Sequence, residues 1–319
     1  MTAVNKATLL VSPIAEDVLR GLTARPRQLP PKLFYDAEGS RLFDEITETP
    51  EYYPTRTERA ILSEYAGEMV GQAGTNVTLI ELGAGSASKT QLLIQAVLRR
   101  QLRAEFYPVD VSSSALQGAL KSLNGHFPRL HVKPVVADYT HRLPDFSSLD
   151  ERKLVLFLGS TIGNFEPDEA QAFLKNVRRS LAPRDALLIG FDLIKNADDL
   201  HAAYNDAAGV TAQFNKNVLA RINRELGGSF DLEAFAHVAF WNRRKSRIEM
   251  HLESVYEQTV WIEDLGRGFH FDRGERIHTE NSYKFNTASI ARLLLRSGFK
   301  LEKQWTDAQG WFCEALARV

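Results

Sequence analysis

Short apolar runs alternate with amphipathic stretches over residues 76–194, and this alternation predicts a repeating strand and helix fold. The apolar runs that we interpret as strands are VTLIELGAG, FYPVDVS, HVKPVVADYT, LVLFLGSTIGN and ALLIGFDLI. The stretches between them have helical spacing, as in SKTQLLIQAVLRR, SSALQGALKSL and DEAQAFLKNVRRSLA. Strands that alternate with helices form βαβ units with right-handed crossovers. We therefore expect an α/β fold with a doubly wound parallel sheet.

The pattern changes after residue 194, which predicts a second domain. A helical stretch, HAAYNDAAGVTAQFNKNVLARINREL, precedes two strand-like runs, AFAHVAFWN and RIEMHLESVYEQTVWI, and then a polar loop that contains HTENSYKF. A helix, SIARLLLRSGF, and two strands, KLEKQWT and WFCEALARV, follow. We expect one domain over residues 60–195 plus 286–319, and a second, α+β domain over residues 1–59 plus 196–285. Pockets concentrate at domain interfaces, so we expect a ligand between the two.

Charge, cysteine content and hydropathy limit the binding partners, the metal sites and the cellular location that we expect. The 39 Lys and Arg residues nearly balance 40 Asp and Glu residues, which gives a formal charge of −1 and disfavours nucleic acid or an anionic membrane as partner. The single cysteine, Cys313, excludes an internal disulfide and a multi-cysteine zinc site. No uncharged apolar run approaches the ~20 residues of a membrane helix, and the N-terminal stretch lacks a signal-peptide cleavage site. We expect a cytoplasmic monomer without a metal.

A glycine turn after the first strand predicts a ligand site. Gly83 and Gly85 end that strand and open a helix, where a ligand can approach the backbone closely. The dinucleotide fingerprint GxGxxG requires glycine at position 88, and this chain has Ser88. The turn alone is a weak signal, because a tight connection without any ligand has the same pattern.

Acidic residues near this turn favour a cationic cofactor. Glu81 precedes the glycines, Asp110 ends the second strand, and Asp138 ends the third strand and is followed by Tyr139. Asp110 could accept both hydroxyls of a ribose, and Tyr139 offers an aromatic face to an adenine ring. A pyrophosphate would prefer donors and positive charge, for which Lys89 is the nearby cation. The ordered carboxylates therefore favour S-adenosylmethionine over NAD, although each one alone could be a helix cap or a solvated loop charge.

The fourth strand ends in GSTIGN, at the edge where open α/β sheets carry their chemistry. Asn164 offers one acceptor and two donors, which could hold an amine and a carboxylate together, or it could simply cap a turn. Amino methyltransferases that act on nucleic-acid bases generally carry Asn or Asp, then Pro-Pro and an aromatic residue here. This chain does not, so a nucleic-acid substrate is disfavoured.

Several motifs resemble one known family. They are PPKLFYDAEGSRLFDEIT, PEYYPTRTE, ELGAGSASKT, FLGSTIGN, YNDAAGVTAQFNKNVL, RIEM and TENSYKF, in this order. Together they closely resemble the histidine Nα-methyltransferases of ergothioneine biosynthesis, over nearly the whole chain. The departures are Ala84 inside the glycine turn and Tyr139 where the family often has Phe.

The resemblance implies a class I S-adenosylmethionine-dependent methyltransferase core, Rossmann-like and doubly wound, with an added substrate-binding domain. It implies that S-adenosylmethionine methylates the α-amine of L-histidine three times to give hercynine. The residues implied to contact the cofactor are Tyr35, Gly83, Lys89, Asp110, Asp138 and Tyr139. Those implied to hold the amino acid's carboxylate and amine are Tyr52, Asn164 and Tyr204, with Glu280 and Ser282 at the imidazole and Thr211 and Met250 lining the pocket.

The chemistry of imidazole agrees with the implied ring site. A neutral imidazole has one N–H and one bare nitrogen, which a carboxylate and a hydroxyl two residues apart, such as Glu280 and Ser282, can satisfy. Methyl transfer from a sulfonium needs alignment and a neutral amine rather than a metal. No His or Lys base is evident in the motifs, so we expect the amine proton to be lost to solvent or through Tyr35. The catalytic candidates are Tyr35 and Asn164. The alternatives are a related methyltransferase for another aromatic amino acid or small amine, a nicotinamide-dependent oxidoreductase and a non-catalytic binding module.

Overall fold

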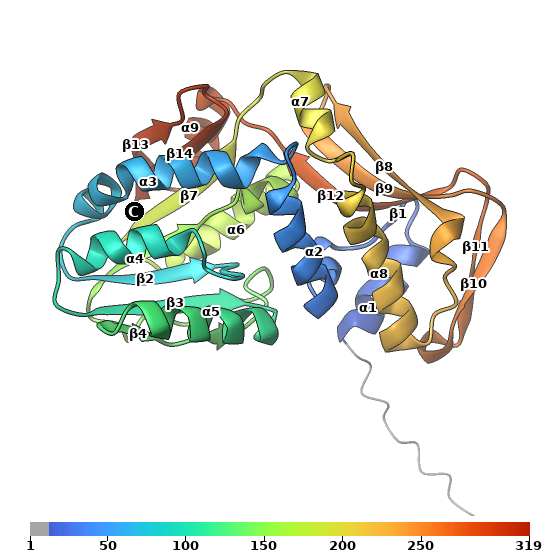
Figure 1. Ribbon diagram of the computed structural model, residues 1–319, viewed down its shortest axis with the longest axis horizontal. Coiled ribbons are helices and arrows are strands. Elements are labelled where there is room, and N and C mark those ends of the chain that lie inside the picture. The colour runs from blue at the N-terminus through green and yellow to red at the C-terminus, as the bar shows by residue number, and fades with distance from the viewer. Residues whose placement is uncertain (1–12) are drawn as a thin grey trace, which may run out of the picture. The chain divides into compact units, whose positions relative to one another are not determined.

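The computed structural model describes residues 13–319, which form two compact units (Figure 1). The larger unit comprises residues 35–211, 239–249 and 281–319, and the smaller comprises 13–34, 212–238 and 250–280. The sequence boundaries instead group residues 35–59, 196–211, 239–249 and 281–285 with the second domain. The helix α3 (Tyr53–Ala73) explains part of this difference, because it begins before residue 60 and covers the sheet of the larger unit. The signal-peptide assessment concerns residues outside the described ones.

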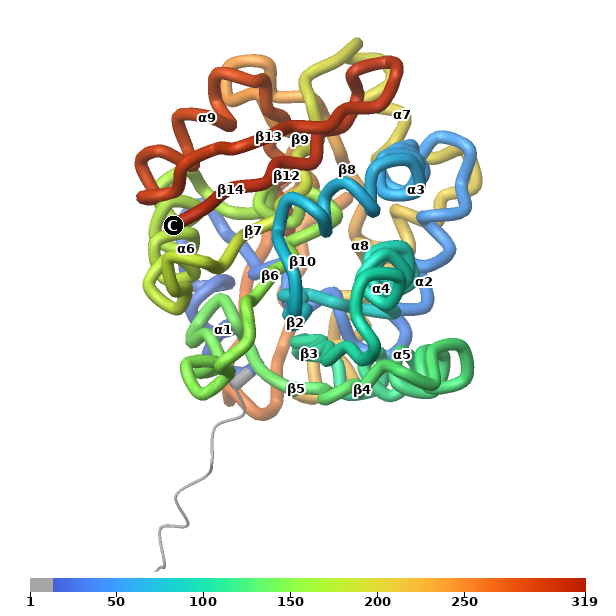
Figure 2. Tube along the Cα trace, turned by 90° about the vertical axis from the view of Figure 1, so that its left-hand side faces the viewer, coloured from blue at the N-terminus to red at the C-terminus, as the bar shows by residue number. Residues whose placement is uncertain are grey.

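An eight-stranded sheet forms the centre of the larger unit. Its order is β13-β14-β7-β6-β2-β3-β4, with β5 also paired to β3 (Figure 2). The strands are β2 (Val77–Leu82), β3 (Ala104–Asp110), β4 (Leu130–Val132), β5 (Val135–Val136), β6 (Arg152–Phe157), β7 (Ala186–Asp192), β13 (Lys300–Thr306) and β14 (Phe312–Arg318). The strand pairs β7-β6, β6-β2, β2-β3, β3-β4 and β3-β5 are parallel. Strand β14 is antiparallel to both of its neighbours, β7 and β13. The expected doubly wound sheet is confirmed.

The central strands coincide with the apolar runs of the sequence. Every residue of β2 and β7 is buried, as expected for parallel strands that are covered on both faces. One expected strand is divided: the run HVKPVVADYT forms the short strands β4 and β5. Pro134 lies between them, and it has no N–H to donate to a continuous ladder.

Helices cover both faces of this sheet (Figure 2). On one face lie α3, α4 (Thr90–Leu98) and α5 (Ser113–His126), whose buried side chains include Met69, Leu93 and Leu123. On the other lie α6 (Pro167–Arg179) and α9 (Thr287–Arg296), with Phe173 and Leu294 in the core. The same unit holds α2 (Ala37–Glu48), the 3₁₀ turn η2 (Thr161–Asn164) and α7 (Ala197–Ala202). The two apolar layers fix the strand ends that carry the candidate site.

The smaller unit has its own aromatic core. The rings of Phe230, Phe235 and Phe271 pack with centroids 5.4–6.2 Å apart, and the Arg27 guanidinium lies 4.3 Å from the Phe271 centroid. Its elements include α1 (Pro13–Thr23), β1 (Arg27–Gln28), η1 (Pro31–Phe34), most of α8 (Val210–Leu226), η3 (Leu232–Ala234), β10 (Gln258–Ile262), η4 (Glu263–Leu265) and β11 (Arg267–Phe271). Strands β10 and β11 form an antiparallel pair.

The segment HTENSYKF, expected to be a polar loop, belongs largely to a strand. It contributes to β12 (Arg276–Tyr283), in a sheet of order β1-β12-β9-β8 with β9 (Arg247–Ser254) and β8 (Phe235–Asn242). Its position between β1 and β9 gives its backbone hydrogen-bonding neighbours, so a strand forms although the residues are polar. Thr279, Glu280 and Asn281 are accordingly buried.

Candidate functional site

Polar side chains gather where the parallel strands of the large sheet end. Strands β2, β3, β6 and β7 are mutually parallel, so their carboxyl ends meet at one edge. Ligands of open α/β sheets bind outside this edge. The residues predicted from the sequence at these ends are Gly83, Asp110 and Asn164.

The glycine turn is packed tightly against Tyr139. Gly83 has φ +75°, a left-handed conformation that favours glycine. A Cβ added there would lie 2.8 Å from Tyr139 Oη, so the tyrosine occupies the space that a side chain would need. The Gly85 N–H donates to Asp110 Oδ2 at 2.9 Å. The structure therefore brings Gly83, Asp110 and Tyr139 together, as the sequence analysis expects.

Asp110 has acceptor capacity beyond its backbone contacts. Its Oδ1 accepts from the Ser112 N–H at 2.9 Å and its Oδ2 from Gly85, while a carboxylate offers about four lone-pair sites. Asp138 accepts from the backbone and hydroxyl of Thr140. Burial, followed by the charges of Asp110 and Asp138, raises the pKa of the Tyr139 phenol, so this hydroxyl stays protonated.

Two charged residues of the turn are engaged inside the protein. Lys89 forms an ion pair with the fully buried carboxylate of Glu58. Glu81 is 3% exposed and accepts from Thr90 Oγ1 at 2.7 Å. Burial raises the pKa of Glu81 to about 8, against the lowering effects of Thr90 and Lys89. In this structure the Glu81 side chain therefore anchors the first turn of α4 through Thr90.

The loop that carries Asn164 is held by contacts within the larger unit. A Cβ added at Gly163 would lie 2.9 Å from the Tyr283 carbonyl oxygen, so the loop approaches the end of β12 directly. Glu166, next along the chain after Phe165, accepts from Tyr283 Oη at 2.7 Å and from Asn281 Nδ2 at 3.1 Å. These contacts fix Asn164 near the end of β12, which also carries Ser282.

Aromatic rings connect three of the predicted tyrosines. The Tyr35 and Phe43 centroids are 5.9 Å apart, those of Phe43 and Tyr52 are 6.2 Å apart, and those of Tyr52 and Tyr204 are 6.4 Å apart. Each pair has an edge-to-face arrangement, which suits the quadrupoles of the rings. Phe43, which sequence reasoning missed, therefore links Tyr35 to Tyr52.

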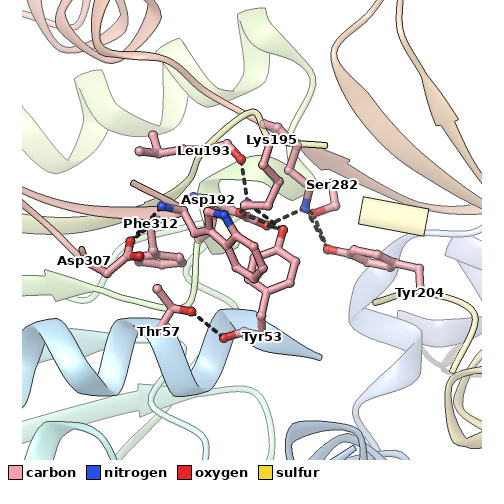
Figure 3. A network of polar contacts seen from close by, with 12 residues as sticks. Tyr53, Thr57, Asp192, Leu193, Lys195, Tyr204, Ser282, Asp307 and Phe312 are labelled. Carbon is pink, nitrogen blue, oxygen red and sulfur yellow. Dashed lines mark hydrogen bonds and ion pairs between the residues drawn. The ribbon is translucent and has the colours of Figure 1, made fainter. Parts of the chain in front are cut away.

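A buried polar network surrounds the end of β7 (Figure 3). Lys284 Nζ donates to Tyr204 Oη at 3.0 Å, to Ser282 Oγ at 2.8 Å and to Asp192 Oδ2 at 2.8 Å. Tyr204 Oη donates to Ser282 Oγ at 2.6 Å. On the other side of Asp192, Lys195 also donates to its carboxylate. The structure thus places Tyr204 beside Ser282 and adds Lys284 and Asp192 to the candidate site.

Tyr53 and Lys195 complete the network at Asp192 (Figure 3). Tyr53 Oη contacts the two carboxylate oxygens at 2.9 and 2.8 Å, and Lys195 Nζ donates to Tyr53 Oη at 2.7 Å. Burial lowers the pKa of Lys195 to about 8, although Asp192 opposes the shift. The ammonium groups of Lys284 and Lys195, on either side of Asp192, are therefore each held by several hydrogen bonds.

The remaining predicted residues are also buried. Glu280, on β12, and Met250, on β9, belong to the smaller unit and are 8% and 2% exposed. The hydroxyl of Thr279 donates to the Met250 carbonyl at 3.1 Å. Thr211 lies in the larger unit, where its N–H donates to Asp206 Oδ1 at 2.8 Å.

Some residues of the site had a signal in the sequence that we did not use. Asp192 ends a strand as Asp110 does, and Lys284 follows Ser282 by two residues. Glu58 had none, because it lies far along the chain from its partner Lys89. Among residues 13–319, no cluster of three or more His, Cys, Asp or Glu side chains is suited to a metal ion. No helix in that range is both long and apolar enough to cross a membrane.

Comparison with known proteins agrees with this arrangement. The family model described as histidine-specific methyltransferase, SAM-dependent, matches residues 14–319. A histidine N-alpha-methyltransferase of Mycolicibacterium smegmatis is 44% identical, over 95% of this chain and 94% of that protein. Ergothioneine biosynthesis protein 1 of Neurospora crassa is 30% identical over 92% of this chain, which corresponds to 33% of that longer protein.

A solved structure independently supports the fold. An S-adenosylmethionine-dependent methyltransferase from Clostridium acetobutylicum ATCC 824 superposes with a TM-score of 0.50 at 12% identity, covering 87% of this chain and 97% of that one. The expected class I methyltransferase fold is confirmed. With a family model that matches nearly the whole described chain, the protein belongs to the histidine-specific, S-adenosylmethionine-dependent methyltransferase family.

Proposed function

We propose that this protein transfers three methyl groups from S-adenosylmethionine to the α-amine of L-histidine and so produces hercynine. The observation that carries the proposal is the relative named histidine N-alpha-methyltransferase, 44% identical over 95% of the chain. The strand-end site supports it, because it combines a cofactor turn with side chains suited to an amino acid.

The residues of the glycine turn fit S-adenosylmethionine better than a dinucleotide. The Lys89 ammonium is paired with Glu58, so it is poorly placed to neutralise a pyrophosphate. Asp110 keeps acceptor sites for ribose hydroxyls after its two backbone contacts. Gly83 would let the cofactor approach the backbone, and Asp138 with Tyr139 would flank the adenine. We place Lys89 and Tyr35 at the edge of the same site.

The amino acid's carboxylate and amine are assigned to side chains that follow β6 and α7 and to one that precedes α3. The Asn164 amide can donate to the carboxylate and accept from the amine. Tyr52 and Tyr204 have rings in edge-to-face contact, and each adds a hydroxyl. Tyr204 already donates to Ser282, so we assign it an accepting role toward the amine. Thr211 and Met250 are proposed to line the pocket.

The imidazole is assigned to Glu280 and Ser282. They lie two residues apart on β12, and side chains at this spacing point to the same face of a strand. Glu280 would accept the ring N–H, while Ser282 would donate to the bare nitrogen. An amino acid without these ring atoms would leave buried polar groups unpaired, which is the physical basis of selectivity for histidine.

S-adenosylmethionine supplies an electrophilic methyl group on a sulfonium. The chain's own residues have to align a neutral amine and keep water away, and alignment alone accounts for much of the rate enhancement of such sites. The amine must lose a proton before it attacks. We propose that Tyr35 passes this proton toward solvent and that Asn164 orients the nitrogen lone pair.

Mass spectrometry of L-histidine incubated with the protein and S-adenosylmethionine tests the proposal. We expect products heavier by one, two and finally three methyl groups, and one S-adenosylhomocysteine for each methyl transferred. Tryptophan and tyrosine serve as matched substrates. Methylation of either one in preference to histidine would move the assignment to another aromatic amino acid, and NADH binding without methyl transfer would reject a methyltransferase.

A further inference from the structure

The ammonium group of Lys284 has three hydrogen-bond acceptors around it. They are Asp192 Oδ2 at 2.8 Å, Ser282 Oγ at 2.8 Å and Tyr204 Oη at 3.0 Å. An ammonium has three N–H donors, so each acceptor takes one. The Lys284 side chain is fully buried and pairs with Asp192, a carboxylate that it shares with Lys195. Lys284 is therefore held at a fixed distance from both hydroxyl groups.

These contacts determine what Ser282 can offer to a ligand. A serine hydroxyl has one O–H donor and two acceptor lone pairs. Lys284 Nζ donates to one lone pair, and Tyr204 Oη donates to the other at 2.6 Å. The O–H of Ser282 is then the group that remains for a substrate. A ligand atom at this position has to be an acceptor.

We propose that Lys284 is a positioning residue which, with Tyr204, makes Ser282 an obligate donor, so that the site binds the neutral imidazole ring and rejects the imidazolium. This inference rests on the proposed function, because it takes the histidine ring to lie at Ser282. Neutral imidazole presents a bare nitrogen to the Ser282 O–H. Imidazolium presents N–H donors at both nitrogens and finds no lone pair on Ser282.

Several other charged or titratable groups face this cluster. Asp192 and Lys195 lie beyond Lys284, Tyr53 contacts Asp192, and Glu280 lies two residues from Ser282 on β12. Burial lowers the pKa of Lys195 to about 8, so its titration falls at the alkaline end of a neutral range. Measurements between pH 5 and 7.5 therefore follow mainly the ring of histidine, whose ordinary pKa is about 6.5.

The test is the pH dependence of histidine binding to the protein saturated with S-adenosylhomocysteine, measured by calorimetry. A site for neutral imidazole should weaken about 30-fold from pH 7.5 to pH 5, because only about 3% of the ring is neutral at pH 5 when its pKa is about 6.5. The analogue 1,2,4-triazol-3-ylalanine keeps a neutral ring in this range. Its affinity should change much less.

Two variants release a lone pair on Ser282 by different routes. Lys284→Met removes the ammonium donor, and Tyr204→Phe removes the phenol donor while leaving the lysine in place. Both should bind histidine more weakly at pH 7.5, and both should lose the steep decline, to less than about fivefold between pH 7.5 and 5. If Lys284→Met does not fold, Tyr204→Phe alone decides the test.

Lys195→Met is the matched control. It removes another buried lysine from Asp192, but Lys195 contacts neither Tyr204 nor Ser282. It should keep the slope of the parent protein, and any titration of Glu280 acts in all the proteins alike. A slope in both test variants equal to that of the parent would overturn the inference. Failure of the parent protein to bind histidine at any pH would instead reject the proposed function.

Discussion

The carboxyl groups of Glu58, on α3, and Glu314, on β14, face each other in the interior of the larger unit. A Cβ added at Gly190 would lie 2.7 Å from Glu58 Oε1 and 3.0 Å from Glu314 Oε1. Both side chains are fully buried, and Lys89 pairs with Glu58. Two adjacent carboxylates cannot both be ionised at low cost, so Glu314 holds a proton. Burial first, and then the charge of Glu58, raises the pKa of Glu314 well above its ordinary value.

Glu314→Gln should change how stability depends on pH. The folded pKa of Glu314 is raised, so its stabilising contribution is complete below the unfolded value of about 4.3 and is lost as pH rises toward the folded pKa. Glutamine keeps a hydrogen-bond donor and does not titrate. We expect the stability of the variant relative to the parent to be lowest near pH 5 and to increase with pH. At pH 8.5 the relative gain should be at least about 3 °C in melting temperature, because one pKa unit is worth about 1.4 kcal/mol.

Thermal melts at pH 5, 7 and 8.5 measure this effect. Glu64→Gln is the matched control, because Glu64 lies on the same helix as Glu58 but is exposed. It should leave the pH dependence unaltered. A Glu314→Gln curve parallel to that of the parent would show that Glu314 is ionised in the folded protein. Glu81 is retained in both proteins, so its raised pKa affects them equally.

Gly83→Ala should destabilise the protein and weaken cofactor binding. The left-handed φ of +75° costs a side chain about 1–2 kcal/mol, and the added Cβ would collide with Tyr139 Oη. The melting temperature should fall by several degrees. The double variant with Tyr139→Phe should recover part of the loss, because only the collision is relieved. Gly67→Ala, in α3 with open space around it, should be neutral or stabilising.

Glu280→Ala should raise the KM for histidine about 10- to 100-fold, since an unpaired buried donor costs about 1–3 kcal/mol. The affinity for S-adenosylmethionine should change less than about twofold. Glu280→Gln keeps an acceptor oxygen and should lose less. Steady-state kinetics with each substrate varied in turn separate the two effects. Equal losses for histidine and cofactor would contradict a role at the ring.

Tyr35→Phe should lower kcat at least about tenfold and shift the rate profile to higher pH, if the phenol passes on the amine proton. Tyr52→Phe is the comparison, because Tyr52 belongs to the same aromatic row but is assigned to substrate binding. It should act mainly on the KM for histidine. An unaltered pH profile in Tyr35→Phe would remove the tyrosine from the proton route.

The fold was predictable where local pattern and tertiary position agree. The segments that form β2, β6 and β7 are short, mainly apolar runs, and such runs predict buried strands. The polar residues of β12 do not predict a strand. This strand forms because it pairs with segments that are distant in the chain. Pro134 divides one expected strand into β4 and β5, because proline has no N–H to donate to the ladder. Glu81 is buried and accepts a hydrogen bond from Thr90, a contact that the sequence analysis did not expect.

The site was predictable at strand ends and less so beyond them. Asp110 and Asn164 follow strands that are parallel, so their meeting at one edge follows from topology. The contacts of Lys284 with Asp192, and of Glu58 with Glu314, join residues whose separation in the chain gives no local signal. The ligand roles of all the predicted site residues, and the monomeric state, stay predictions.

The inside position of β14 has a consequence for synthesis of the protein on the ribosome. This strand follows every other strand of the large sheet in the chain, yet it lies between β7 and β13 and supplies Glu314 to the interior. Until it is made, β7 has an exposed edge of unpaired backbone groups, which is a template for aggregation. The nascent chain therefore needs protection until a late stage, and a premature stop codon before residue 312 would yield an open, aggregation-prone sheet rather than a smaller enzyme.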